Sequence, residues 1–157
     1  SIRLVGLDID GVLSDGTVSL DEAGHQRRVF DIKDGLGIVR LVESGCRVVV
    51  ISSSTSIAGV DRLERLGVTP IHTGVTNKLD VLTTEVQAAG LDWSQVAYMG
   101  DDLPDLECLE RVGFAVAPAD AVLRVRRVAH YVTRASGGRG AVRELSDLIV
   151  DGVDPGE

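Results

Sequence analysis

Residues 4–16 read Leu-Val-Gly-Leu-Asp-Ile-Asp-Gly-Val-Leu-Ser-Asp-Gly, and the organisation of the rest of the chain follows from them. A short apolar run bounded by turn residues is typical of a buried strand. Asp8 and Asp10 come at its carboxyl end, where ligands bind in an open α/β sheet. Two carboxylates this close repel each other unless a cation or a shared proton stabilises them. Both could be simple turn formers, but Asp-x-Asp-Gly directly after a buried strand favours a functional site.

The composition limits the fold and the partners. A chain of 157 residues is long enough for one domain with a substantial core, so we expect residues 1–157 to form a single domain. The formal net charge of −8 argues against nucleic acid or an anionic membrane as a partner. A bound divalent cation would still permit an anionic substrate. No apolar run is long enough to span a bilayer, and no stretch reads as a signal peptide.

The two cysteines and the first residue bear on the origin of the chain. Cys46 and Cys108 are far apart in apolar surroundings, which indicates reduced thiols of a cytoplasmic protein. The chain begins at Ser1 without Met. We therefore expect that it is processed or cut from a longer polypeptide.

Strand and helix patterns alternate along the chain. Residues 17–20 and 27–32 flank a turn and predict a β-hairpin beside the acidic site; an ordinary edge hairpin is the alternative. Further strands are predicted over 47–51, 68–72, 96–99, 114–116 and 129–132. Helices are predicted over 35–44, 57–66, 78–89, 121–127 and 141–150, the first capped by Asp34, the third by Asn77, and the last followed by a frayed tail over 151–157. Short β-branched strands alternating with helices predict an α/β fold, with a mostly parallel, Rossmann-like sheet between two layers of helices.

Polar groups follow several of the predicted strands or begin the next helix. They are Asp8, Asp10, Ser52, Lys78, Asp101, Asp102 and Asp105. All strand ends of a parallel sheet face one edge, so these groups can converge. Oxygen ligands from Asp8 and Asp101, with a backbone carbonyl, suit Mg²⁺. A carboxylate beside Mg²⁺ can attack phosphorus, a second can act as acid and base, and a hydroxyl and an ammonium can hold phosphate oxygens.

The order Asp-x-Asp, Ser, Lys and Gly-Asp-Asp-x-x-Asp resembles the four motifs of the haloacid dehalogenase superfamily. Residues 8–16, 29–38, 95–105 and 137–144 narrow the resemblance to its capless phosphatases. These are the phosphatases of 3-deoxy-D-manno-octulosonate 8-phosphate, those of nine-carbon, sialic-acid-type keto-acid sugar phosphates, and the phosphatase-like domain attached to some acylneuraminate cytidylyltransferases. The resemblance extends from residue 3 to residue 150.

The resemblance implies a role for each residue of the expected site. Asp8 matches the nucleophile and a metal ligand. Asp10 matches the general acid and base, with its backbone carbonyl on the metal, and Asp101 matches the third protein ligand. Ser52 matches the phosphate-binding hydroxyl, and Lys78 matches the lysine that bridges the phosphate and the nucleophile.

The resemblance also implies a supporting group of residues. Asp102 is expected to support the metal ligands without binding the metal itself. Asp105 is expected to orient the loop or Lys78, and the alternative is a carboxylate that only starts a helix. Arg62 matches an arginine that reaches the substrate carboxylate in a neighbouring subunit; a solvated helix face is the alternative. Arg139 is a similar candidate in a loop whose glycines are expected to give mobility, although that loop could merely connect strand to helix. Family members form tetramers in which the hairpin, here residues 17–32, helps to close a neighbour's site.

The second motif departs from the family pattern. It usually reads Thr-Gly-Arg in the octulosonate phosphatases, whereas here it is Ser52-Ser53-Ser54. Serine keeps the hydroxyl, so the chemistry is expected to survive, but the missing arginine leaves the choice between eight-carbon and nine-carbon substrates open. His25, His72 and His130 have no metal-ligand spacing and are predicted to be structural, as are Trp93 and Tyr98, which are predicted to pack in the interior.

The sequence therefore predicts a Mg²⁺-dependent phosphatase of a keto-acid sugar phosphate that forms an aspartyl-phosphate. The alternative is a regulatory or oligomerisation domain of an acylneuraminate cytidylyltransferase, either fused to it or associated with it. The retained Asp8, Asp10 and Asp101 favour the enzyme. A signalling receiver domain is rejected because Lys78 precedes the Gly-Asp-Asp motif, whereas in a receiver the lysine comes last.

Overall fold

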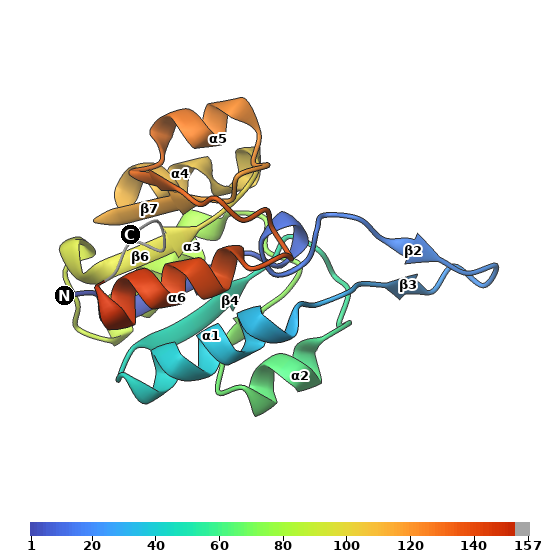
Figure 1. Ribbon diagram of the computed structural model, residues 1–157, viewed down its shortest axis with the longest axis horizontal. Helices are drawn as coiled ribbons and strands as arrows, with labels where there is room; N and C mark the ends of the chain where they lie inside the picture. The colour runs from blue at the N-terminus through green and yellow to red at the C-terminus, as the bar shows by residue number, and fades with distance from the viewer. Residues whose placement is uncertain (153–157) are drawn as a thin grey trace.

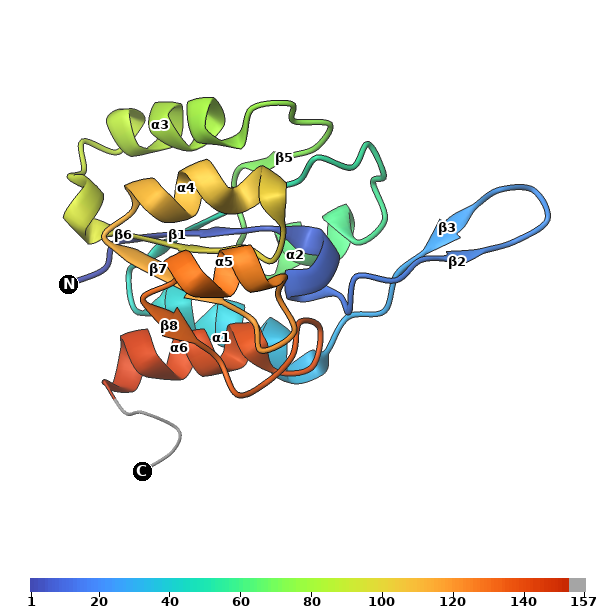
Figure 2. The ribbon, with the colours of Figure 1, turned by 90° about the horizontal axis from the view of Figure 1, so that it is seen from above.

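A computed structural model describes residues 1–152 of the chain. Six parallel strands form one sheet in the order β5-β4-β1-β6-β7-β8 (Figures 1 and 2). The strands are β1 (Leu4–Leu7), β4 (Arg47–Ile51), β5 (Ile71–His72), β6 (Val96–Met99), β7 (Phe114–Ala117) and β8 (Tyr131–Val132). The main helices are α1 (Ile32–Glu43), α2 (Val60–Arg65), α3 (Lys78–Ala88), α4 (Leu106–Arg111), α5 (Leu123–Val128) and α6 (Ala141–Asp151). The predicted parallel α/β sheet is confirmed.

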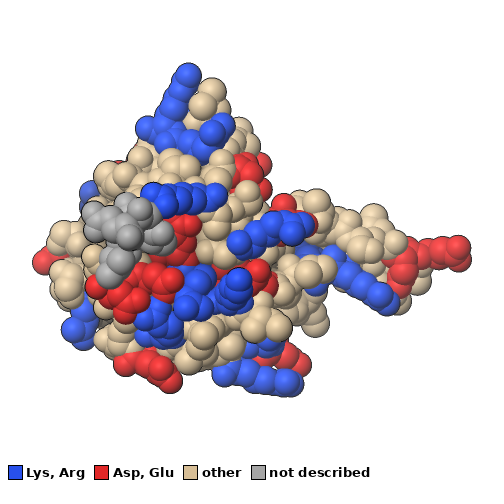
Figure 3. All heavy atoms as spheres, viewed as in Figure 1, with Lys and Arg blue, Asp and Glu red and all other residues tan. Residues whose placement is uncertain are grey.

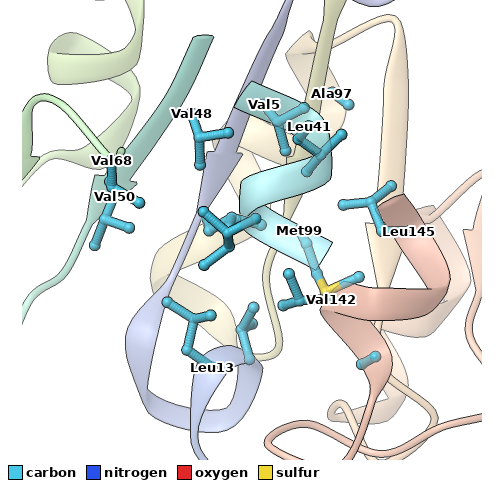
Figure 4. Close-up of a cluster of buried hydrophobic side chains, with 14 of the residues drawn as sticks. Val5, Leu13, Leu41, Val48, Val50, Val68, Ala97, Met99, Val142 and Leu145 are labelled. Carbon is cyan, nitrogen blue, oxygen red and sulfur yellow. The ribbon is translucent and has the colours of Figure 1, made fainter. Parts of the chain in front are cut away.

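Alternate residues of each strand point to opposite faces of the sheet, and each face is covered by a different group of helices. Val5 and Leu7 of β1 pack in a cluster with α1, α2 and α6, as Figure 4 shows for Val5, Leu41, Val142 and Leu145. Leu4 of β1 packs in a second cluster with α3, α4 and α5. Both clusters are mainly aliphatic, as expected from an aromatic content of 3%.

The hairpin is shorter than predicted and projects from the body of the molecule (Figure 2). Its strands are β2 (Ser19–Leu20) and β3 (Gln26–Arg27), which pair antiparallel. The predicted second strand over 27–32 is wrong at its end because α1 already begins at Ile32. Asp31 starts this helix by accepting the backbone N–H groups of Lys33 and Asp34, at 2.6 Å and 3.3 Å.

The prediction that Asp34 caps α1 is also wrong. Asp34 lies inside α1, is 1% exposed and points to the start of α6. Its carboxylate accepts the N–H of Arg143 at 2.9 Å and that of Gly140 at 3.3 Å. Gly37, on the same helix, touches the backbone of Arg143, so an added Cβ would lie 3.0 Å from the Arg143 Cα. Asp34 therefore caps a different helix, which α1 contacts closely along its length.

The helix α4 was not predicted, and the remaining differences concern element ends. Residues 57–59 precede α2 as a turn, in which Ser56 Oγ accepts the N–H of Ala58 and Gly59 has φ +85°. Asp151 is the last residue of α6 rather than the first of a tail, and it pairs with Arg40. The rest of the predicted tail, residues 153–157, lies outside the described residues. Within residues 1–152, every helix is too short or too polar to cross a bilayer.

Candidate active site

The carboxyl ends of three central strands form a cavity of about 230 Å³. Asp8 follows β1, Ser52 follows β4, and Asp101 lies two residues beyond β6. The Asp8 N–H donates to the Met99 carbonyl at 3.2 Å, which holds the end of β1 beside that of β6. The cavity is lined by Asp8, Asp10, Gly16, Ser52, Ser53, Ser54, Lys78, Asp101, Asp102, Pro104 and Asp105. The structure thus brings together all the predicted site residues except the two arginines.

Lys78 reaches the floor of the cavity from the first turn of α3. Asn77 caps this helix as predicted, because its side chain accepts the N–H of Asp80 at 3.1 Å. Lys78 is 3% exposed, and its Nζ lies 2.9 Å from Asp8 Oδ1 and 2.8 Å from Asp105 Oδ1. Burial lowers the pKa of Lys78, but the two carboxylates outweigh it and the pKa is raised, so the ammonium is charged.

Asp105 is 1% exposed and joins the ammonium to the loop after β6. Besides Lys78 Nζ, it accepts the backbone N–H groups of Asp101 at 3.0 Å and Asp102 at 3.3 Å. Any side chain at Gly100 would collide with it. Asp105 therefore contacts both of the groups that the sequence offered as its targets.

Tyr98 is a fourth donor to Asp105 and was missed as a site residue. It packs in the interior as predicted and is fully buried on β6, and its hydroxyl donates to Asp105 Oδ1 at 2.7 Å. A buried tyrosine hydroxyl generally needs a partner. That need was the only signal in the sequence, and it does not identify the partner.

Asp8 and Asp101 are both harder to ionise than ordinary aspartates. Burial raises the pKa of Asp8, and the charge of Asp105 raises it further, while Lys78 lowers it. The pKa of Asp101 is raised by burial and then by the charges of Asp8 and Asp105. A cation placed between the two carboxylates would stabilise the ionised form of both.

The donor set fits a hard divalent cation. Carboxylate oxygens of Asp8, Asp101 and Asp105 lie within 4.8 Å of one another, and such oxygens are the ligands that Mg²⁺ prefers. Asp105 is already engaged by four donors, so Asp8 and Asp101 are the better ligands. Gly11, with φ +86°, makes room for Asp101, since a Cβ at residue 11 would overlap its carboxylate.

The Asp10 carboxylate is held by an arginine of the hairpin that the sequence did not identify as a site residue. Arg28 comes from the base of the hairpin, and its Nε and Nη2 donate to Asp10 Oδ1 and Oδ2 at 2.6 Å and 3.2 Å. Its Nη2 also donates to Ser54 Oγ at 3.1 Å. Nothing in the local sequence singles out Arg28 for this contact.

Ser52 and Asp102 border the cavity in different ways. Ser52 is 1% exposed, and its Oγ accepts the N–H of Ser54 at 3.2 Å. Asp102 is exposed, and its carboxylate accepts the N–H of Leu103 at 2.7 Å, at the start of the short helix η3 (Leu103–Asp105). The Asp102 side chain thus belongs to a helix start at the rim.

The structure brings neither Arg62 nor Arg139 to the lining of this cavity. Arg62 is exposed on α2, and its guanidinium lies against Gly35 of α1, where a Cβ would be 2.7 Å from Nη2. The pKa of the exposed Asp15 carboxyl is lowered mainly by the hydrogen bond from the Thr17 hydroxyl. Arg139, which is also exposed, lies close enough to lower this pKa further. Any contact of either arginine with a substrate would have to occur outside this cavity.

The glycine-rich loop before α6, which the sequence predicted to be mobile, packs against the turn that follows Asp8. The Gly138 N–H donates to the Val12 carbonyl at 2.9 Å, and the Gly137 N–H donates to Asp120 at 2.9 Å. A Cβ at Gly137 would collide with the Gly11 carbonyl. These glycines permit close contact with the turn η1 (Ile9–Leu13), which follows Asp8.

Comparisons with known proteins agree with this geometry. A family described as haloacid dehalogenase-like hydrolase matches residues 66–145. The 3-deoxy-D-manno-octulosonate 8-phosphate phosphatase of Escherichia coli K12 is 41% identical over 150 residues, which cover 96% of this chain and 80% of that protein. The protein of the same name from Yersinia pestis has the same identity and coverage.

Solved structures show the same similarity. The octulosonate 8-phosphate phosphatase of Moraxella catarrhalis, solved with magnesium, phosphate and a KDO molecule, has a TM-score of 0.92 and 36% identity over 96% of this chain and 86% of that chain. The cobalt-bound phosphatase of Haemophilus influenzae has a TM-score of 0.90 and 35% identity over 98% and 91%.

Proposed function

The chain belongs to the haloacid dehalogenase-like hydrolases, and because its relatives there are phosphatases, we propose that it is a Mg²⁺-dependent phosphatase of 3-deoxy-D-manno-octulosonate 8-phosphate. The observation that carries the proposal is the contact between Lys78 and Asp8 inside a cavity that also contains Ser52 and Asp101. A nucleophile, an ammonium, a hydroxyl and a metal ligand are the groups that phosphoryl transfer through a carboxylate requires.

Asp8 is the nucleophile of the proposed reaction. One of its oxygens attacks phosphorus while the bond from phosphorus to the sugar oxygen breaks, which leaves a phosphoryl group on Asp8 and an alcohol. Asp10 protonates the departing oxygen and then takes a proton from the water that attacks the phosphoryl group. Phosphate leaves, and the Asp8 carboxylate is restored.

Lys78 and Ser52 hold the phosphoryl oxygens. The charged ammonium of Lys78 offsets the negative charge that develops in the transition state, and Asp105 keeps it in place. Asp8, Asp101 and the backbone carbonyl of Asp10 are the proposed Mg²⁺ ligands, and bound Mg²⁺ supplies charge neutralisation and alignment of the phosphate.

The regulatory-domain alternative is not favoured. A domain without catalytic function has no need for buried charges, which are costly to maintain. Here Asp8, Lys78 and Asp105 are all buried, and the ammonium lies between the two carboxylates. This arrangement supports an enzyme.

We further propose that residues 1–157 act as one domain within a homotetramer, in which the hairpin covers the cavity of a neighbouring copy. The hairpin projects from the body, and apolar side chains are exposed on it and beside it. These are Val18, Leu20, Val29, Ile32 and Ile57, from 44% to 81% exposed. Figure 3 shows acidic side chains at the hairpin tip, and basic and acidic side chains intermingled on the body. Arg62 is the candidate for reaching a neighbour's substrate.

The cytoplasm is the proposed location, and the small-molecule sugar phosphate is the proposed partner. Cys46 and Cys108 are buried free thiols, which is usual in a reducing compartment.

Phosphate release with Mg²⁺ over a panel of substrates tests the function. The panel comprises octulosonate 8-phosphate, neuraminate 9-phosphate, its deaminated analogue and glucose 6-phosphate. Strong preference for the octulosonate ester is expected. Preference for a nine-carbon ester would replace the proposed substrate, and no hydrolysis of any of these esters or of 4-nitrophenyl phosphate would overturn the phosphatase assignment.

A further inference from the structure

The Arg28 side chain turns back from the hairpin into the site. The hairpin around it is exposed, whereas the Arg28 side chain is only 4% exposed. All three guanidinium nitrogens are engaged: Nε by Asp10, Nη1 by Gln26 Oε1 at 3.1 Å, and Nη2 by both Asp10 and Ser54. A guanidinium with this many partners has one orientation.

The contact with Asp10 uses both carboxylate oxygens. Two parallel N–H···O bonds fix the plane of a carboxylate as well as its position. Asp10 itself is more than one-third exposed and lies on a turn whose backbone is irregular at Asp10 and Gly11. Arg28 therefore restricts a side chain that its own backbone segment leaves free to rotate.

The contact with Ser54 joins Arg28 to the phosphate-binding segment. Ser54 N donates to Ser52 Oγ at 3.2 Å, and Ser54 Oγ accepts the N–H of Ser56 at 3.1 Å. The loop after β4 is thus held by successive serine turns. The guanidinium connects this loop, the Asp10 turn and the hairpin at one point.

We propose that Arg28 is a positioning residue, which orients the Asp10 carboxylate for proton transfer and couples the hairpin to the site. The kinetic part of this proposal rests on the phosphatase function proposed above. A neighbouring copy that displaces the hairpin would therefore also displace Asp10, because Arg28 contacts both.

Arg28→Met is the main test variant, because methionine keeps an aliphatic stem and removes the guanidinium. Arg28→Lys is the conservative variant, since its ammonium can still reach Asp10. Arg27→Met is the matched control: Arg27 is exposed on β3 and pairs with Ser19 in the hairpin ladder. Ser54→Ala removes one anchor of the guanidinium and leaves Asp10 intact.

Kinetics distinguish positioning from substrate binding. General acid and base catalysis contributes about 10²- to 10⁴-fold, so Arg28→Met is expected to lower kcat on octulosonate 8-phosphate by about 10- to 100-fold while KM changes by less than about twofold. Arg28→Lys should recover most of the loss, and Arg27→Met, which leaves the Arg28 guanidinium in place, should lower kcat far less than Arg28→Met does. A rise in KM at unchanged kcat would overturn the proposal in favour of direct substrate binding.

The leaving group gives a second readout. 4-Nitrophenolate departs without a proton, so the first step on 4-nitrophenyl phosphate should be nearly normal in Arg28→Met. The second step still needs Asp10 as a base, so a burst of 4-nitrophenol should appear. Equal slowing of both steps without a burst would contradict the proposed action through Asp10.

Hydrogen exchange tests the coupling without any turnover. Amide exchange of residues 17–31 should be faster in Arg28→Met than in the wild type or Arg27→Met, and Ser54→Ala should have a smaller effect that is not additive with Arg28→Met. Unchanged exchange would overturn the coupling even if the enzyme is active.

If the wild type hydrolyses 4-nitrophenyl phosphate but no sugar-acid ester, the proposed substrate fails while the Arg28 proposal is still decided by the burst and the exchange rates. If it hydrolyses neither, the phosphatase assignment and the kinetic role of Arg28 fall together, and exchange alone decides the coupling.

Discussion

The Tyr98 hydroxyl donates to Asp105 at the same oxygen, Oδ1, that accepts the Lys78 ammonium. The two donors lie 2.7 Å and 2.8 Å from that oxygen, and both are buried with it. A residue in the middle of the sheet thus restricts the carboxylate that positions the lysine of the site.

Tyr98→Phe is expected to lower kcat by about tenfold, because small misplacements of a catalytic group are costly. Three other donors still hold Asp105, so the fold should persist. Steady-state kinetics and a thermal melt check this. Tyr131→Phe is the control, since the Tyr131 hydroxyl bonds Glu144, which does not line the cavity; an equal loss of kcat in both variants would contradict a specific role for Tyr98.

Asp8→Asn is expected to abolish phosphate release, because an amide oxygen is too weak a nucleophile to replace the carboxylate. The fold should be retained, since Asn keeps the shape of the side chain. Circular dichroism and phosphate release are the measurements. Asp61→Asn, an exposed change on α2, should be fully active, and substantial turnover by Asp8→Asn would refute the nucleophile assignment.

Gly11→Ala is expected to weaken Mg²⁺ binding by about 10- to 100-fold, the range seen when support of a metal ligand is lost. The new Cβ would collide with the Asp101 carboxylate and displace it. Gly24→Ala is a matched control, because its φ of +82° imposes similar backbone strain with no atom within 4 Å of the new Cβ. Calorimetric titration with Mg²⁺ should separate the two variants; equal affinities would contradict the predicted displacement of Asp101.

Chelation should stop phosphate release, and added Mg²⁺ should restore it. The affinity for Mg²⁺ should also rise with pH from 6 to 8, because burial and the Asp8 charge raise the pKa of Asp101 to about 8. A proton and the cation compete for this carboxylate, and fewer protons are bound as the pH rises. Titrations at several pH values check this, and an affinity independent of pH would contradict it.

Asp34→Ala is expected to destabilise the protein by about 1–2 kcal/mol, the usual cost of a lost helix cap. It removes the acceptor for two N–H groups at the start of α6. Because the contact joins α1 to α6, amide exchange in the first turn of α6 should be faster in Asp34→Ala than in the wild type, and the free energy of unfolding should be lower. Asp31→Ala, which uncaps α1 instead, should speed exchange in α1; the same pattern in both variants would argue against the cross-helix cap.

The sequence predicted the sheet well because the signals are local. Short apolar runs that end at Asp8, Ser52 and Asp101 correspond to strand ends in the structure. It predicted element ends less well at the hairpin, where Asp31 and Asp34 are both plausible caps but only Asp31 caps α1.

The convergence of Asp8, Lys78 and Asp101 also follows from the sequence, since parallel strands place their carboxyl ends on one edge. Two contacts could not be predicted in this way. The contact of Arg28 with Asp10 depends on how far the hairpin folds back over Asp10. The contact of Tyr98 with Asp105 depends on the turn that returns Asp105 beneath β6.

The sequence by itself determined the alternation of strands and helices along the chain, the acidic edge of the sheet and the residues available for phosphate chemistry, because these depend on neighbours along the chain. The tertiary structure alone decided which partner each polar side chain has. Asp34 caps α6 because α1 packs against it, and Arg28 reaches Asp10 and Ser54 across 18 and 26 residues of chain. Such contacts depend on how distant elements pack, and local periodicity carries no information about them.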